Sequence, residues 1–274
     1  MIKFLLKGLV RDKSRSSIPL IVVAIGAMLT VILHAYMKGF MGDTIEMNAR
    51  FNYGHLKVMT KPYSENISQL PNDLAILDAT KLLKELETLF PDAEWSQRIQ
   101  FGGLIDSPDE NGETKAQGPA MGMGLDLFST GAAEPQRLNL EKSIIRGKMP
   151  DAPGEILVSD NFSRKLMAGP GDNVTFIGST MNGSMTVFDF IVAGTVSFGT
   201  EALDRGTIIA DLRDVQQALD MPDATGEIAG FFRTGFYDNE SAVAASEKFN
   251  SLHSNDNDEY HPVMKSLSQQ GSMG

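Results

Sequence analysis

One short stretch of the chain gathers side chains that commonly bind metal ions. Residues 253–261 read HSNDNDEYH, and their candidate ligands are His253, Asp256, Asp258, Glu259 and His261. Imidazole and carboxylate groups at close spacing are typical metal ligands. However, the stretch lacks the glycine that an EF-hand calcium loop needs at its sixth position, and a predicted helix and strand flank it. We therefore interpret it as a solvated turn and predict no metal site.

The other motifs that could carry chemistry are incomplete. Gly147-Lys148 lacks the upstream glycine of a phosphate-binding loop, and neither G-x-S-x-G nor H-E-x-x-H occurs. The chain has no cysteine, which excludes a thiolate nucleophile, a disulfide, an iron–sulfur cluster and a cysteine zinc site. Met121 and Met123 could bind a soft metal, but methionines more commonly fill a core. We predict no catalytic residue, no cofactor and no enzymatic activity.

Charge is distributed unevenly along the 274 residues. Residues 1–41 hold six basic side chains and one acid, a net of +5, and the remainder holds 18 basic and 34 acidic groups, a net of −16, which sum to −11. A basic arm on an acidic body could bind nucleic acid. The apolar run that follows the arm argues against this interpretation, and we predict no nucleic-acid partner.

Residues 18–37 form twenty consecutive residues without a formal charge, IPLIVVAIGAMLTVILHAYM. A helix of that length rises about 30 Å, the thickness of the hydrocarbon layer, so the run predicts a transmembrane helix. Pro19 falls in its first turn, where the missing N–H costs little. Gly26 and Ala27 form a small-residue patch, which is typical of helices that pack closely in membranes.

Basic residues predict that the N-terminus is cytoplasmic. Five of them precede the apolar run, whereas Lys38 beyond it is followed by Asp43 and Glu46, so the large acidic part is predicted to lie outside. A cleaved signal peptide is the alternative, but the run is too long and no small-x-small cleavage site follows it. In residues 1–16 apolar residues recur at helical spacing, which predicts a basic amphipathic helix at the inner leaflet, or else a solvated basic tail.

The membrane helix is predicted to continue as a stalk. Phe40, Met41 and Ile45 extend its apolar pattern, and Asn52-Tyr53-Gly54 ends it. A rigid helix over residues 17–53 would couple the membrane to the part of the chain that follows.

A first βαβ unit is predicted after the stalk. Residues 55–60 alternate as in a strand, Asp78 stands at the N-cap of a helix that Pro91 ends, and a second strand spans 94–106. A turn at 107–112 follows.

A second βαβ unit is predicted near the end of the chain, with strands at 227–237 and 258–263 and a helix at 241–252. One apolar stripe of this helix is predicted from Ala244, Ala245, Phe249 and Leu252. Two such units form a ferredoxin-like, porter-like α+β domain over 54–111 and 227–264.

Residues 112–226 predict an inserted β-rich subdomain. Its predicted elements are strands at 155–159, 173–177, 185–193 and 206–210, and helices at 160–167 and 212–219. Asn182-Gly183 is a strong signal for a hairpin between two of these strands. We take Asn182 and Gly183 as the candidate partner contact, although the same pattern fits a plain turn.

Several stretches, taken in order, resemble a known family. The run at 5–37, whose basic residues lead into Ala24-Ile25-Gly26, resembles the opening of ABC transporter permeases of the MacB/FtsX/LolCE type. Further similar stretches follow in the family's order at 54–58, 124–126, 154–159, 171–175, 190–194, 204–210 and 214–217.

The resemblance implies an α+β fold with one N-terminal transmembrane helix and a periplasmic ferredoxin-like domain that carries an inserted β-rich subdomain. It also implies a bacterial inner-membrane protein that pairs with a second permease copy or homologue and with a separate cytoplasmic ABC ATPase. In such systems the stalk transmits ATP-driven movement to the periplasmic domain, which acts on a lipoprotein, a lipid or an exported compound.

Two departures from the family pattern bear on these expectations. The pattern continues with three more spans, whereas this sequence ends after a tail at 265–274 that would lead into the second span, so we expect an N-terminal fragment. Lipoprotein-releasing members dock a carrier through a long hooked hairpin, whereas the matching hairpin here, 177–186, is short. This difference argues against carrier docking by this chain.

Two functions therefore remain open from the sequence. The leading hypothesis is the permease subunit of a mechanotransmitting ABC transporter, with Gly26 and Ala27 for helix packing and Phe40, Met41 and Ile45 in the stalk. The alternative is a non-transporting membrane anchor whose outer domain binds and regulates an envelope protein such as a cell-wall hydrolase. The absence of a recognisable substrate-pocket signal motivates this alternative.

Overall fold

A computed structural model of the chain describes residues 13–254 and 258–270. It separates into two compact units, Met1–Asn48 and Ala49–Gly274. Residues 1–12, on which the prediction of an amphipathic helix mainly depends, lie outside the described residues, as does Asp256 of the candidate metal-binding stretch.

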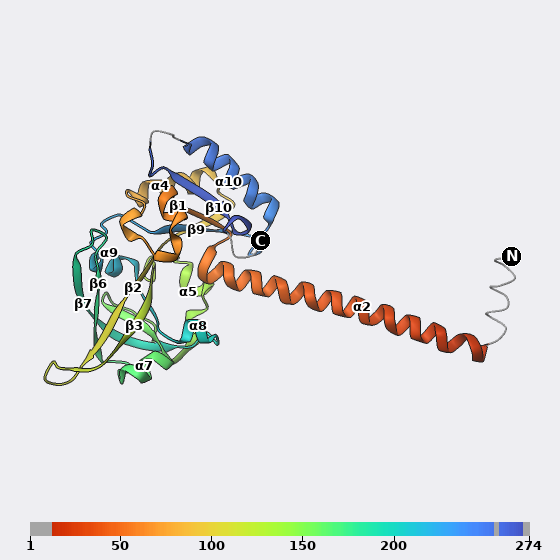
Figure 1. Cartoon of the computed structure of the whole chain (residues 1–274), viewed down its shortest axis with the longest axis horizontal. Coiled ribbons are helices and arrows are strands. Elements are labelled where there is room, and N and C mark those ends of the chain that lie inside the picture. The colour runs from red at the N-terminus through yellow and green to blue at the C-terminus, as the bar shows by residue number, and fades with distance from the viewer. Residues whose placement is uncertain (1–12, 255–257, 271–274) are drawn as a thin grey trace. The chain divides into compact units, whose positions relative to one another are not determined.

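In the first unit, the described residues form one long helix, α2, which spans Lys13–Asn48 (Figure 1). Its segment Ser17–Met37 has a mean hydropathy of 2.4 and no buried residue, and by length and composition it can cross a membrane. The helical backbone continues beyond Met37, as predicted. The side chains of Phe40, Met41 and Ile45 lie outside the described part of the chain, so their role in a stalk stays a prediction.

The second unit begins with a π-helical turn, η1, over Ala49–Tyr53, and Gly54 then ends the helical path with φ +68°. The Gly54 amide donates to the carbonyl of Ala49 over 2.7 Å. A Cβ at Gly54 would lie 2.6 Å from the carbonyl oxygen of Leu56. Glycine is therefore required where the chain turns from helix into strand, and the predicted helix end is confirmed.

Four antiparallel strands follow in the order β10-β1-β9-β2. The strands are β1 Leu56–Thr60, β2 Ala93–Pro108, β9 Glu227–Phe232 and β10 Pro262–Ser266, and the helices that connect them are α4 Ala79–Leu89 and α10 Asn239–His253. This is the strand order of a ferredoxin-like fold. Both predicted βαβ units are confirmed, although β9 ends earlier and β10 begins later than predicted.

Helices α4 and α10 cover one face of this sheet, where Leu86 and Phe249 pack with Val58 (Figure 1). In α10 the buried residues are Ala242, Ser246 and Phe249. The predicted stripe is wrong at two of its four positions, because Ala244 and Leu252 are exposed.

The N-terminus of α4 is capped from a distant part of the chain. Asp78 stands at the predicted N-cap, but its backbone is left-handed (φ 52°) and its side chain makes no capping bond. The amide of Thr80 instead donates to Asp223 Oδ1 over 3.1 Å. The predicted N-cap position is confirmed, but a partner 143 residues away, and not the Asp78 side chain, supplies the acceptor.

The residues between the two βαβ units complete a closed ring of six strands. Beyond the ferredoxin-like sheet, β2 pairs with β3 and β6, and the ring continues β3-β8-β5-β7 and back to β6. The added strands are β3 Thr114–Leu125, β5 Glu155–Ser159, β6 Asn173–Ser179, β7 Met185–Val196 and β8 Thr207–Asp211. The β-rich insert is thus a small barrel, and β2 belongs to both parts.

Aromatic rings fill the interior of this barrel. Phe101 and Phe176 meet edge to face with ring centroids 5.2 Å apart. A Cβ on Gly122 would lie 2.1 Å from the Phe101 ring, so the small residue makes room for the large one. Helix α7 reaches β3 at Gly118 and helix α9 at Gly124, so they cover opposite ends of the barrel.

Short elements complete the described chain. They are α3 Lys61–Glu65, η2 Ile67–Gln69, η3 Asn72–Leu74, α5 Glu134–Arg137, α6 Leu140–Ser143, β4 Ile144–Gly147, α7 Asp160–Leu166, α8 Glu201–Asp204, α9 Leu212–Ala218 and η4 Leu267–Gln269. The fold class is α+β, as predicted.

Candidate functional site

The second face of the ferredoxin-like sheet carries charged side chains and is nevertheless buried. Lys57 of β1, Arg98 of β2 and Glu227 of β9 alternate with the core residues beneath α4 and α10, so they lie on the opposite face. Their exposures are 1%, 0% and 0%. Hydrogen bonds from this face reach η1 and α5, which cover it.

One ion pair joins β1 to β9 and to the end of η1. Lys57 Nζ lies 2.6 Å from Glu227 Oε2 and donates to the carbonyl oxygen of Asn52 over 2.5 Å. Gln100 of β2 donates to the other oxygen of Glu227 over 3.3 Å.

A second ion pair joins β2 to α5 and to η1. Arg98 Nη2 lies 2.7 Å from Glu134 Oε2 and donates to the carbonyl oxygen of Arg50 over 2.8 Å. Arg137 also pairs with Glu134, and its guanidinium lies 3.9 Å from the ring centroid of Phe231. The two pairs and the carbonyls of residues 50–52 are called the helix-end network from here on.

The helix-end network supplies hydrogen-bond donors to carbonyl groups at the end of a helix. The last carbonyls of a helix have no partner within it and form the negative end of its dipole, so cations are favoured there. Lys57 and Arg98 supply cations from two strands to the carbonyls that end the helical path begun in α2. Any displacement of this terminus therefore acts on the sheet through charged hydrogen bonds.

Burial and charge act against each other within the network. Burial lowers the pKa of Lys57, although Glu227 beside it acts in the opposite direction. Burial would raise the pKa of Glu134, but Arg98 and Arg137 outweigh it and hold that pKa below its ordinary value. Glu134 is therefore ionised at neutral pH.

Buried ion pairs of this kind contribute little net free energy to the stability of a folded chain. Removing two charges from water costs several kcal/mol per ion, and well-packed apolar residues are often as stable in their place. The network does offer directionality, because Arg98 binds a carboxylate and a main-chain carbonyl at fixed angles. We conclude that this face fixes the geometry between η1 and the sheet.

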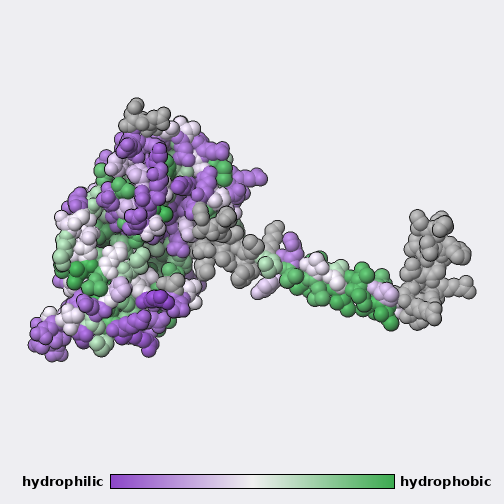
Figure 2. Space-filling view, viewed as in Figure 1, coloured by the Kyte–Doolittle hydropathy of each residue, from purple (hydrophilic) through white to green (hydrophobic). Residues whose placement is uncertain are grey.

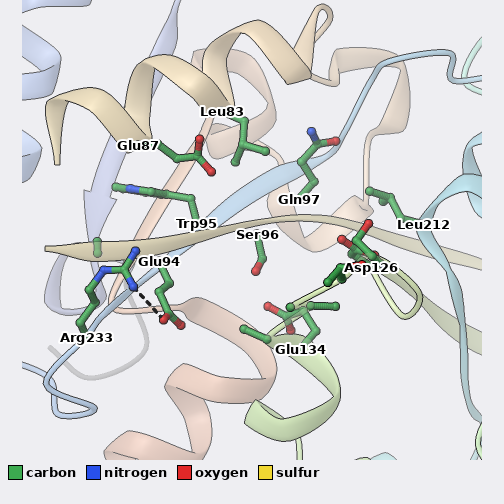
Figure 3. Close-up of a pocket in the computed structure, with 16 residues that line it drawn as sticks. Leu83, Glu87, Glu94, Trp95, Ser96, Gln97, Asp126, Glu134, Leu212 and Arg233 are labelled. Atoms are coloured by element: carbon green, nitrogen blue, oxygen red, sulfur yellow. Dashed lines mark hydrogen bonds and ion pairs between the residues drawn. The ribbon is translucent and has the colours of Figure 1, made fainter. Parts of the chain in front are cut away.

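A cavity of about 380 Å³ lies beside the network. Figure 3 shows Trp95 and Gln97 of β2 pointing toward α4, while Glu94 and Ser96 point to the side where Glu134 lies. Arg233 pairs with Glu94 over 3.2 Å. The residues that line this cavity include four carboxylates, of Glu87, Glu94, Asp126 and Glu134, and no histidine, lysine or cysteine.

The candidate metal-binding stretch makes other contacts where it is described. His253 stacks on Phe249 with ring centroids 3.9 Å apart, and its Nε2 lies 3.1 Å from Glu85 Oε1. His261 Nδ1 lies 2.6 Å from the carbonyl oxygen of Asp258. Within residues 13–254 and 258–270, no group of three metal-binding side chains comes together.

No protein-family model matches the chain, and no curated protein matches it. Two solved structures are similar to it at 13% identity. One is the periplasmic region of MacB from Actinobacillus actinomycetemcomitans, with a TM-score of 0.48 over 80% of this chain and 94% of that one. The other is a domain of a protein designated as a permease from Porphyromonas gingivalis, with a TM-score of 0.40 over 68% of this chain and 82% of that one.

The predicted helix-packing residues lie on the exposed part of α2. A Cβ at Gly26 would meet no atom within 4 Å, and Thr30 Oγ1 donates to the carbonyl of Gly26 over 2.9 Å. Gly26 and Ala27 thus leave a small-residue surface open to a neighbouring helix. Their role in packing stays a prediction.

The predicted hairpin at Asn182-Gly183 is confirmed. It joins β6 to β7, and Gly183 has φ +79°. Asn182 and Gly183 line a hollow of about 700 Å³ together with Pro71 and Asn72. A partner contact at this tip stays a prediction.

The four charged residues of the helix-end network were not predicted. Charges at alternate strand positions are typical of a solvated face, and the sequence gives no sign that η1 and α5 cover this one. One sequence feature could have indicated that this face is buried. It is the presence of opposite charges at positions that face the same side of three strands: Lys57, Arg98 and Glu227. Arg98 and Glu227 are direct neighbours in the register.

Proposed function

We propose that this chain belongs to a permease subunit of a mechanotransmitting ABC transporter. A separate cytoplasmic subunit would hydrolyse ATP, and a second permease copy or homologue would complete the membrane part. The substrate would be a lipoprotein, a lipid or an exported compound in the periplasm or the outer leaflet. The ordered resemblance of the sequence to this family and the apolar helix Ser17–Met37 support the proposal.

The proposed location is the bacterial inner membrane, with a cytoplasmic N-terminus and a periplasmic second unit. The excess of basic residues before the apolar segment supports this orientation. Accessibility of single introduced cysteines to a membrane-impermeant reagent tests it. A cysteine at exposed Glu110 should react in intact spheroplasts, and a cysteine at Ser14 should react only after the membrane is opened.

The helix-end network is the observation that carries the mechanical part of the proposal. A transporter of this kind needs a firm attachment between the membrane helix and the outer unit, since a loose linker would absorb the movement. Here the terminal carbonyls bind Lys57 and Arg98, which are held by Glu227 and Glu134. Within the second unit, the attachment of η1 involves three strands and α5, so force that reached η1 would spread over the sheet.

Affinity purification from native membranes tests the proposed function. The tagged protein, expressed in its natural genomic context, should bring down a subunit with a phosphate-binding loop of the Walker type. A tagged membrane protein of similar abundance serves as the control. Failure to recover such an ATPase under several mild detergents would overturn the proposal.

A second candidate is the non-transporting anchor that binds an envelope enzyme. The hollow of about 700 Å³ beside the hairpin tip favours it, because it joins the barrel to residues 69–73 and could seat a loop of a partner. Stoichiometric recovery of a cell-wall hydrolase, without an ATPase, would support this candidate over the transporter.

A further inference from the structure

Four neighbouring strands of the barrel, β7, β6, β2 and β3, present one face outward. Directly paired residues of antiparallel strands project to the same face, so the register defines rows across it. The central row is apolar on all four strands: Val187, Ile177, Leu104 and Pro119. This row, with Met185 and Met121 beside it, is called the outer apolar face.

The outer apolar face is exposed at its two ends, and Ile177 and Leu104 between them are partly buried. Met185, Val187 and Met121 are 73%, 60% and 56% exposed. Figure 2 shows hydrophobic side chains gathered over β6 and β7, beside the hydrophilic tip of the β2–β3 hairpin. Met121 was predicted to fill a core, and this prediction is wrong because the even-numbered residues of β3 face the barrel interior instead.

Contiguity distinguishes this face from ordinary surface. Single exposed apolar residues are common, but a contiguous group on a strand surface marks a binding site. Two long, flexible methionines border the row, and methionine is enriched at protein interfaces because it adapts to its partner.

A polar row borders the outer apolar face on one side: Asp189, Thr175, Asp106 and Gln117. Thr175 donates to Asp189 over 2.7 Å. Asp106 Oδ1 is buried and has no hydrogen-bond partner in the described part of the chain. Asp106 as a whole is partly exposed, so a basic group of a partner can approach its carboxylate from outside.

The β2–β3 hairpin extends this negative border. Residues 106–115 hold four carboxylates, at Asp106, Asp109, Glu110 and Glu113, against one lysine. That lysine, Lys115, donates to the carbonyl of Met167 over 2.7 Å. The hairpin therefore presents a net charge of −3 beside the apolar row.

We infer that the outer apolar face docks a partner protein through a segment in which lysine or arginine stands beside large apolar side chains. The apolar side chains would cover Val187 and its neighbours, and a basic group would reach Asp106. A second copy of this chain would bring the same carboxylates and be repelled, as would an anionic lipid surface. The inference concerns a different surface from the helix-end network and does not depend on the ATPase partnership.

A pair of matched peptides tests the inference on the full chain in nanodiscs of neutral lipid. Both peptides alternate valine with serine, one with lysines at its ends and the other with glutamates, and each carries a fluorescent label for anisotropy. The lysine-ended peptide should bind at least tenfold more tightly. Its affinity should fall as salt rises, because exposed charges are screened.

Three variants locate the binding. Val187→Lys should weaken the lysine-ended peptide about tenfold, and Asp106→Asn should reduce both its affinity and the salt dependence. Ile145→Lys is the matched control, since Ile145 is 55% exposed on β4, away from this face. It should leave binding unchanged.

The outcomes separate the possible occupants. Equal affinity for both peptides, no effect of Val187→Lys, or an equal effect of Ile145→Lys would overturn the inference. Sedimentation of the detergent-solubilised chain adds a second measurement. If the wild type self-associates and Val187→Lys dissociates it, the face is an interface between copies and the inference is overturned as well.

Discussion

At the scale of single residues, Glu134 determines how the helix-end network responds to acid. Two guanidinium groups, of Arg98 and Arg137, keep this buried carboxylate ionised. The folded chain therefore binds a proton at Glu134 less readily than the unfolded chain does. Stability from this group is full above its ordinary pKa of 4.5 and is lost as pH falls through the lower folded value.

Glu134→Gln should destabilise the second unit by about 3 kcal/mol, because it leaves the fully buried guanidinium of Arg98 without its counter-ion and leaves Arg137 with Glu94 alone. The difference from the wild type should narrow as pH falls below 4.5, because the unfolded wild-type chain takes up a proton at Glu134 before the folded chain does. Trp95 is the only tryptophan and is largely buried, so its fluorescence reports urea unfolding of the full chain.

Asp160→Asn is the matched control for this measurement. Asp160 also has a pKa below its ordinary value, because its partners Arg146, Arg164 and Thr195 outweigh the effect of burial. Arg164 is 69% exposed, so the loss of this pair should cost less, about 1 kcal/mol. If the two variants lose the same unfolding free energy, the larger cost expected for breaking the helix-end network is contradicted.

At the scale of elements, the barrel depends on small residues that face large ones. Gly122→Ala would place a methyl group 2.1 Å from the Phe101 ring and should destabilise the chain by about 2 kcal/mol. Gly102→Ala on the neighbouring strand is the control, because the nearest atom, the sulfur of Met121, would lie at an ordinary 3.8 Å. Urea unfolding followed by Trp95 fluorescence compares the two variants. An equal loss of unfolding free energy would show that the barrel interior can repack around the added methyl group.

The sheet edge at β10 is protected by one side chain. Asn250 of α10 accepts from the amide of Met264 over 2.8 Å and donates to its carbonyl over 2.9 Å, so it occupies the place of a neighbouring strand. Asn250→Ala should cost about 1–2 kcal/mol and promote self-association through the opened edge. Size-exclusion chromatography and urea unfolding measure both effects. Ser251→Ala, one residue along, should change neither.

The elements themselves follow from periodicity and turn chemistry. Both βαβ units, the Asn182-Gly183 hairpin and the helix end at Gly54 were predicted, because each depends on nearby residues. Contacts between distant residues could not be predicted in this way. The capping of α4 by Asp223 and the covering of Arg98 by η1 both depend on where the chain returns in space.

At the scale of the whole molecule, the proposed function requires that movement of α2 reach the second unit. The cysteine-free sequence allows spin labels at two introduced cysteines, Met37→Cys in α2 and Glu110→Cys on the β2–β3 hairpin. In the complex with its ATPase, the distance between the labels should shift between the nucleotide-free and ATP-trapped states.

The double variant Arg98→Met with Glu134→Leu should separate folding from transmission. Apolar residues of similar volume often replace a buried ion pair with little loss of stability, and Arg137 keeps its ion pair with Glu94, so the fold should persist. However, the hydrogen bond from Arg98 to the carbonyl of Arg50 is lost, and η1 is no longer joined to β2 and α5 through it. We expect ATP hydrolysis to continue while the label shift falls by at least half. Lys148→Met with Asp151→Leu, an exposed pair, is the control that should leave the shift intact. If the shift survives in the double variant, the movement reaches the second unit by a route other than the helix-end network.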